Sequence, residues 1–190
     1  MKRKIARIVS QVGHPIVLIL AFLTYFLFSI HSAEKAFQTI LIILLLGILP
    51  LILWNLTRTK KGLYSNFDVS IRSQRYSMYL FIMSLAILVL LALWANGQPN
   101  SVLIGSVILI QLLLFAFFIN FKSKISLHVT LTIFTAFGFW EINPWIAIGL
   151  WLISPIIAWS RWYLQRHQPL ELFYGLLLGM LCGIEIILFI

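Results

Sequence analysis

The fold class follows from Ser77–Ala95, which reads SMYLFIMSLAILVLLALWA and contains no charged residue. A helix needs about 20 apolar residues, or roughly 17 at the shortest, to cross the ~30 Å hydrocarbon core of a membrane. This stretch therefore predicts a transmembrane helix. The whole chain has the same character, since 62% of its 190 residues are hydrophobic, 10% are charged and its mean hydropathy is +1.02. We expect an all-α, polytopic integral membrane protein.

Other apolar stretches resemble this one, so the sequence predicts about seven transmembrane helices in a single membrane domain, residues 1–190. The seven segments are Pro15–Ile30, Phe37–Leu56, Ser77–Ala95, Val102–Phe121, Ser126–Trp140, Pro144–Trp159 and Leu170–Ile190. The fifth and sixth segments are short and would form one re-entrant hairpin, giving six spans, if the chain turned back at Asn143-Pro144. Two short spans are favoured because irregular backbone in lipid leaves polar groups unpaired.

The cations indicate the partner and the orientation. The net charge is +9, but the charged residues are scattered between apolar runs, which argues against a nucleic-acid-binding face and indicates lipid as the partner. With seven crossings, every Lys and Arg except Lys35 falls on the side of the N-terminus. The ratio is still eight to one without the five cations that are candidates for an anion site. The positive-inside rule then predicts that this side is cytoplasmic.

Three connections on the predicted cytoplasmic side carry polar residues suited to binding phosphate. They are Arg72-Ser-Gln-Arg75, Lys122-Ser-Lys124-Ile-Ser126-Leu-His128, and Ser160-Arg161 together with His167 and Glu171. Pro169 favours the first position of the last helix, which puts His167 just outside that helix and Glu171 in its first turn. Ser126 is a candidate N-cap for the fifth helix. Helix N-termini attract anions, so these groups predict a phosphate pocket.

The chemistry that uses such a set is phosphoryl transfer through a phosphohistidine. A neutral imidazole attacks phosphorus, a carboxylate fixes its tautomer, and a second histidine protonates the leaving group. We expect no metal or other cofactor, because positive neighbours oppose a divalent cation and the chain has no HExxH motif, cysteine pair or acidic cluster. His14 and His31 are interpreted as interfacial residues without such neighbours. Gly175, Gly179 and Gly183 indicate close helix packing.

These residues give the chain a resemblance to the type 2 phosphatidic acid phosphatase superfamily, specifically to a small divergent bacterial branch. The family motif S-R-x5-H-x3-D is matched by Ser160-Arg161, His167 and Glu171, with Glu in place of Asp. The motif P-S-G-H corresponds to Ile125-Ser126-Leu127-His128, which lacks the proline and the glycine. In the motif K-x6-R-P only the arginine has a counterpart, Arg72 or Arg75. The resemblance covers about two thirds of the chain, from Lys60 to Gly179.

The resemblance implies a membrane phosphatase that hydrolyses a lipid phosphate or an isoprenyl diphosphate in a bacterial plasma membrane. His167 would be the nucleophile, Glu171 its orienting carboxylate and His128 the general acid. The phosphate would be bound by Arg161, Ser126, Lys124 and either Arg72 or Arg75. The alternative is a noncatalytic helical membrane protein that binds anionic lipid head groups or is a subunit of a membrane assembly. The loss of the glycine before His128 favours this alternative, because it removes backbone freedom near the phosphate.

Overall fold

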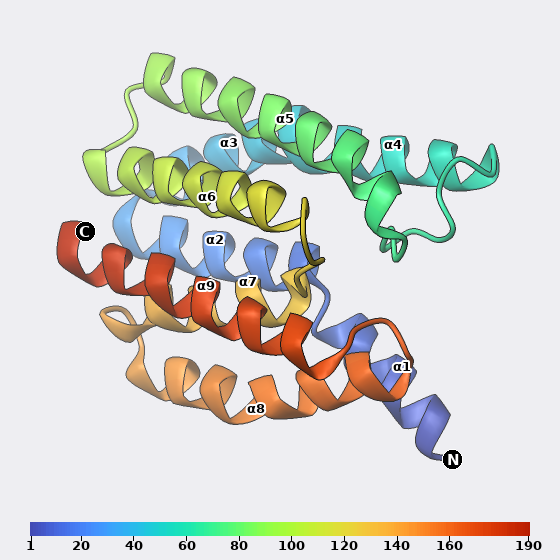
Figure 1. Cartoon of the computed structure of the whole chain (residues 1–190). Helices are drawn as coiled ribbons and strands as arrows, with labels where there is room; N and C mark the ends of the chain where they lie inside the picture. Colours follow the sequence, from blue (N-terminus) through green and yellow to red (C-terminus); the bar gives the residue numbers. More distant parts are fainter. The chain divides into compact units, whose positions relative to one another are not determined.

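The chain is almost entirely helical. The computed structural model describes all residues from Met1 to Ile190 and contains no strand. The helices are, in order, α1 (Lys2–Val12), α2 (Pro15–Ile30), α3 (Ala33–Ile43), η1 (Leu44–Ile48), α4 (Leu49–Lys60), η2 (Arg72–Gln74), α5 (Arg75–Ala95), α6 (Asn100–Ile119), α7 (Leu127–Trp140), α8 (Pro144–Tyr163) and α9 (Pro169–Phe189) (Figure 1). The predicted all-α class is confirmed, and each predicted apolar segment coincides with or overlaps a helix.

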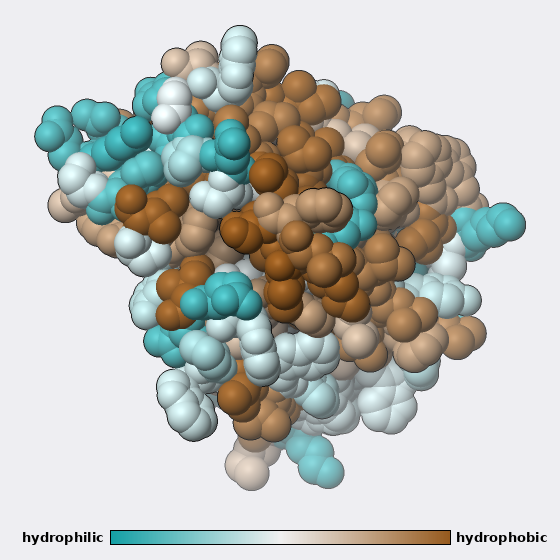
Figure 2. Space-filling model, turned by 90° about the vertical axis from the view of Figure 1, so that its left-hand side faces the viewer, coloured by the Kyte–Doolittle hydropathy of each residue, from teal (hydrophilic) through white to brown (hydrophobic).

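Several of these helices suit a membrane. Five helical stretches are long and apolar enough to cross one, namely Ala33–Lys60, Arg72–Ala95, Asn100–Ile119, Pro144–Tyr163 and Pro169–Phe189. Within the most apolar 18 residues of each stretch, only 17% to 33% of the residues are buried inside the protein. Most of their apolar side chains are therefore available to lipid. Much of the face shown in Figure 2 is covered by apolar side chains. These features are compatible with an integral membrane protein.

The predicted number of seven spans is not confirmed. A sixth span is present if α1 and α2, which are bent by 41° at their junction, count as one broken span. The helix α2 has 16 residues and α7 has 14. At ~1.5 Å per residue they extend about 24 Å and 21 Å, which is less than the ~30 Å of the hydrocarbon core.

The chain divides into two compact units, which we describe separately. Unit 1 comprises Met1–Phe26 and Lys124–Ile190, and unit 2 comprises Leu27–Ser123. Unit 1 therefore contains α1, most of α2, and the helices α7, α8 and α9. Unit 2 contains α3, η1, α4, η2, α5 and α6.

The centre of unit 1 is α7, which contacts both α8 and α9. All of its residues from His128 to Ala136 are buried. Its polar side chains Thr130, Thr132 and Thr135 donate hydrogen bonds to carbonyl oxygens of the preceding turn, so they are accommodated inside an apolar bundle. The aromatic ring of Phe22 in α2 packs edge-on against Phe139, with ring centroids 5.1 Å apart.

Glycines let α9 approach α7 closely. A Cβ atom added to Gly175 would lie 3.0 Å from the carbonyl oxygen of Ser126, and one added to Gly179 would lie 2.5 Å from that of Thr130. At Gly183 the added atom would lie within 2.3 Å of the Phe137 ring. The interpretation of these glycines as a packing surface is confirmed, and this contact fixes the start of α9 beside the start of α7.

In unit 2 a long helical stretch, Ala33–Lys60, is widened at η1, a π-helical segment. Pro50 follows this segment at the start of α4 and has no backbone N–H to donate to the preceding turn, which explains the widening. The helix α5 contacts η1 and α6. The rings of Trp54 in α4 and Phe81 in α5 stack with centroids 4.2 Å apart.

Candidate functional site

The predicted site residues fall into two groups. Unit 1 contains most of them, and unit 2 contains the two candidate arginines before and in α5. The group in unit 1 is Lys124, Ser126, His128, Arg161, His167 and Glu171. We describe this group first and call it the unit 1 cluster.

A hydrogen bond in the cluster joins the side chains of His167 and Glu171. The distance from His167 Nδ1 to Glu171 Oε2 is 2.9 Å, and both residues are buried. Gln168 is the N-cap of α9, Pro169 follows it, and the backbone N–H of Gln168 donates to Glu171 Oε2 over 3.1 Å. The predicted start of the last helix is therefore confirmed. The hydrogen bond at Nδ1 directs the other ring nitrogen, Nε2, away from the carboxylate.

The segment that leads into α7 contacts Glu171 through both its backbone and its side chain. The backbone N–H of Ser126 donates to the Glu171 carbonyl oxygen over 3.3 Å. The Lys124 ammonium lies 3.7 Å from Glu171 Oε2 and donates to the Arg166 carbonyl oxygen over 3.0 Å. Two connections that are distant in the sequence thus converge within unit 1, as predicted.

Arg161, at the end of α8, is linked to the histidine loop through its backbone. Its carbonyl oxygen accepts the N–H groups of Arg166 and His167, at 2.9 Å and 3.3 Å. Gln165, in between, has a left-handed φ of 55°, the conformation that commonly ends a helix in this way. The Arg161 side chain is only 2% exposed, and one of its terminal nitrogens donates to Ser10 Oγ over 2.6 Å. The backbone of Arg161 therefore holds the His167 loop, while its buried guanidinium contacts Ser10 of α1.

Ser126 occupies the predicted N-cap position of α7 but does not make the predicted cap. Its side chain forms no capping hydrogen bond, and its Oγ is fully buried with no hydrogen-bond partner. Its φ and ψ are −86° and 96°. Leaving a buried hydroxyl without a partner costs about 1–3 kcal/mol. A ligand with hydrogen-bonding oxygens would remove this cost.

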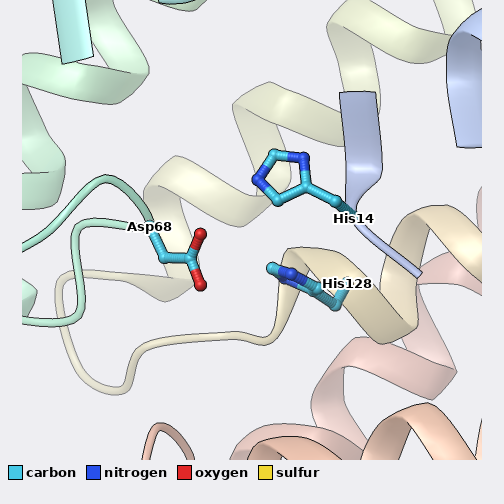
Figure 3. A group of neighbouring side chains, drawn as sticks. All are labelled: His14, Asp68 and His128. Atoms are coloured by element: carbon cyan, nitrogen blue, oxygen red, sulfur yellow. The ribbon is translucent and has the colours of Figure 1, made fainter. Parts of the chain in front are cut away.

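His128 lies in the first turn of α7, where it was predicted, but its neighbour was not predicted. The His14 ring, between α1 and α2, packs edge-on against the His128 ring with centroids 5.2 Å apart (Figure 3). The backbone N–H of Ile16 donates to His14 Nδ1 over 3.2 Å, so a neutral His14 carries its proton on Nε2. The interpretation of His14 as an isolated interfacial residue is wrong, because the turn at Gly13 brings the ring to α7.

The interpretation of His31 also needs correction. His31 Nε2 lies 2.9 Å from Gln98 Oε1, and Gln98 Nε2 donates to Thr39 Oγ1 over 2.8 Å. These three residues form a polar network within unit 2 that joins the end of α2, the middle of α3 and the α5–α6 turn. His31 therefore has a structural partner.

The candidate arginines of unit 2 bind backbone carbonyl groups of that unit. Arg72 donates to the Lys122 carbonyl oxygen over 2.5 Å, and Asn120 Nδ2 donates to the Arg72 carbonyl oxygen over 3.2 Å. The Nε of Arg75 donates to the Val69 carbonyl oxygen over 2.8 Å, and the Arg75 side chain is buried. Both arginines help to hold the 61–74 loop. A role in binding phosphate remains a prediction for them.

The helix α1 and its two contributions to the cluster were not predicted. The basic N-terminus resembles the charge that flanks a span, whereas Lys2–Val12 is a helix that packs on α8. Ser10 on this helix contacts Arg161, and His14 just after it contacts His128. The available signal was the alternation of basic and apolar residues with helical spacing in KRKIARIVSQV.

The unit 1 cluster combines an oriented imidazole, a second imidazole, a buried guanidinium and a buried hydroxyl. This set suits binding of an anion and transfer of a phosphoryl group to nitrogen. His14 and His128, whose rings are in contact, each add an imidazole to this part of unit 1. Comparison of the chain with known protein families, curated proteins and solved structures found no match.

Proposed function

We propose that this protein is a metal-independent membrane phosphatase that hydrolyses a lipid phosphate or an isoprenyl diphosphate through a phosphohistidine. The observation that carries the proposal is the 2.9 Å contact between His167 Nδ1 and Glu171 Oε2 at the start of α9. The resemblance of Ser160-Arg161, His167 and Glu171 to a phosphatase motif supports the same assignment. Within this motif the Arg161 carbonyl oxygen accepts the backbone N–H of His167, and the His167 ring contacts Glu171, which supports the proposal.

In the proposed reaction, Nε2 of His167 attacks phosphorus and the bond between phosphorus and the leaving oxygen breaks. Glu171 holds the Nδ1 proton and stabilises the positive charge that develops on the ring. His128 gives its proton to the leaving oxygen. Water then attacks the phosphohistidine, the P–N bond breaks, and inorganic phosphate is released. The Arg161 guanidinium and the Ser126 hydroxyl hold the phosphoryl oxygens.

A lipid substrate fits the surroundings of this cluster. The cluster lies at the N-terminal end of α7. An apolar hollow of about 580 Å³ lies at the C-terminal end of the same helix. The hollow is lined by Phe137, Trp140, Ile148, Trp151, Leu152 and Ile187. We infer that a substrate presents its phosphate to the cluster while its hydrocarbon chain follows the apolar helices toward this end.

We further infer seven crossings, with α2 and α7 as short spans, in a bacterial plasma membrane. The basic residues at the start of α1 and in the 57–76 loop support a cytoplasmic N-terminus and site. Short spans are tolerated where the bilayer thins locally or where flanking polar residues reach the interface, at modest cost.

A noncatalytic role is the second candidate, and one observation favours it. The Arg161 side chain binds Ser10, and Lys124 binds a carbonyl oxygen and Glu171, so these cations have partners inside the protein. In this alternative the cluster would fasten α1, α7, α8 and α9 together, and the protein would bind anionic lipid head groups without cleaving them.

Release of phosphate distinguishes the two candidates. The purified protein would be incubated in EDTA with a panel of lipid phosphates and isoprenyl diphosphates. We expect turnover of at least one member, and loss of that turnover in His167→Ala. His31→Ala is the matched control, because His31 binds Gln98 in unit 2 and has no proposed role. Absence of turnover across the panel, with retained binding of anionic lipid, would favour the noncatalytic role.

A further inference from the structure

The helix α1 presents three different faces. Ala6 and Ser10 are buried, and Gly13 at the helix end is buried as well. A Cβ atom added to Gly13 would lie 2.6 Å from the Ile157 side chain of α8, so this small-residue face is seated on α8. This contact fixes which sides of α1 are turned outward.

One outward face is apolar and uncovered. Ile5, Ile8 and Val12 follow the spacing of a single helix stripe, and they are 44%, 51% and 62% exposed. No contact within the chain covers this stripe. Three adjacent exposed aliphatic side chains are unfavourable in water but favourable in lipid.

The other outward face is polar and positive. Lys4, Arg7 and Gln11 lie together on this face, Lys2 and Arg3 are exposed at the start of the helix, and α1 contains no acidic residue. A helix with an apolar stripe beside a basic face has the composition of helices that lie at a membrane surface rich in anionic lipid. The positive charge of α1 therefore favours an anionic lipid surface as the partner that covers the apolar stripe.

The geometry at the α1–α2 junction agrees with this placement. With 11 and 16 residues, α1 and α2 together would extend about 40 Å as one straight helix, beyond the ~30 Å of the hydrocarbon core. The 41° bend at the junction turns α1 away from the direction of α2. The excess length therefore falls at the interface between hydrocarbon and head groups.

We propose that α1 docks on an anionic lipid leaflet, with Ile5, Ile8 and Val12 inserted below the head groups and Lys2, Arg3, Lys4 and Arg7 among them. This interaction is independent of the phosphatase assignment. It has a consequence for the unit 1 cluster, since Ser10 on the seated face of the same helix binds Arg161. Docking on the leaflet holds that serine in place.

Site-directed spin labelling measures this docking directly. Single nitroxides would be placed at Ile5, Ile8 and Val12 and, as matched sites on the polar face, at Lys4 and Gln11, in a Cys182→Ser background. The protein would be reconstituted in vesicles of phosphatidylcholine and phosphatidylglycerol. We expect labels on the stripe to collide mainly with oxygen, which concentrates in lipid, and labels on the polar face to collide mainly with a water-soluble nickel complex.

The charge dependence is a second part of the test. In the docked state each cation near an anionic surface contributes about 1 kcal/mol, so Lys4→Gln or Arg7→Gln should lower the ratio of docked to undocked α1 about fivefold. Arg58→Gln is the control, because Arg58 lies over the Trp54 ring in α4. Stripe labels that collide mainly with nickel would overturn the proposal. So would strong spin–spin coupling at Ile8, which would indicate that a second copy of the chain covers the stripe.

Discussion

Replacing Glu171 by glutamine tests whether this residue acts in catalysis or only in helix capping. In the structure Glu171 Oε2 accepts from His167 and from the backbone N–H of Gln168, and the Lys124 ammonium lies 3.7 Å away. A glutamine keeps the length of the side chain, and its oxygen accepts one hydrogen bond as before. It removes the negative charge, however, and its NH₂ group can select the wrong tautomer of His167.

The expected effects on rate and on stability differ in size. Substitutions of orienting and acid–base groups cost roughly 10²-fold or more in turnover, which corresponds to about 2.7 kcal/mol of the activation barrier. The folded state loses an interaction with the helix dipole of about 0.3–1 kcal/mol. It also loses an ion pair with the partly exposed Lys124 that contributes about 0–1 kcal/mol. We therefore expect a large fall in turnover with only a small fall in melting temperature.

The assay measures turnover and melting temperature on the same samples. Glu34→Gln is the matched control, because Glu34 likewise lies in the first turn of a helix, α3, and its side chain binds Gln38. It should lose a similar, small amount of stability without loss of turnover. Glu171→Asp, which restores the residue of the family motif, should retain more activity than Glu171→Gln. Near-normal turnover with a lowered melting temperature in Glu171→Gln would refute the catalytic role.

Three further predictions concern the surroundings of the cluster. Ser10→Ala should raise KM by roughly tenfold to a hundredfold, because the buried hydrogen bond that orients the phosphate-binding arginine contributes about 1.5–3 kcal/mol, and steady-state kinetics measures this change. Gly179→Ala should lower the melting temperature, because its added Cβ would lie 2.5 Å from a carbonyl oxygen and overpacking costs about 1–3 kcal/mol. Gly149→Ala should leave the melting temperature unchanged, because a Cβ added at Gly149 has no neighbouring atom within 4 Å. Single cysteines at the exposed positions Ser65 and Asn96 should respond oppositely to an impermeant thiol reagent outside cells, with only Asn96→Cys labelled.

Each of these outcomes has a control or a contrary result. Ser84→Ala removes a hydroxyl that binds only a carbonyl oxygen of its own helix, so it should leave KM unchanged. An unchanged KM in Ser10→Ala would remove this serine from the site. Equal melting temperatures for the two glycine variants would contradict the close contact of α9 with α7. Labelling at position 65 and not at position 96 would reverse the proposed orientation.

The sequence predicted the helical segments well because each depends on local composition. A long apolar run must satisfy its backbone hydrogen bonds within itself, so helix position follows from the run and from breakers such as Pro144 and Pro169. The number of spans was harder to predict, because it depends on the length of α2 and α7 relative to the bilayer. The helix α1 was missed because its basic residues resembled flanking charge.

The cluster was predicted only where spacing along the chain was informative. His167 and Glu171 are four residues apart at a helix start, so their contact follows from local geometry. The contacts of Ser10 with Arg161 and of His14 with His128 join residues more than 100 positions apart. Such contacts depend on how α1 and α2 pack on α8 and α7, which no local pattern in this sequence specifies.

The phosphohistidine itself is the most direct test of the proposed reaction. The protein would be mixed with a substrate carrying radiolabelled phosphate, quenched within one turnover and separated on a denaturing gel. We predict an acid-labile, base-stable radiolabelled band in the parent protein and in His128→Ala, where the first step is slowed but the nucleophile remains, and no band in His167→Ala. A labelled band that persists in His167→Ala would contradict the assignment of this histidine as the nucleophile.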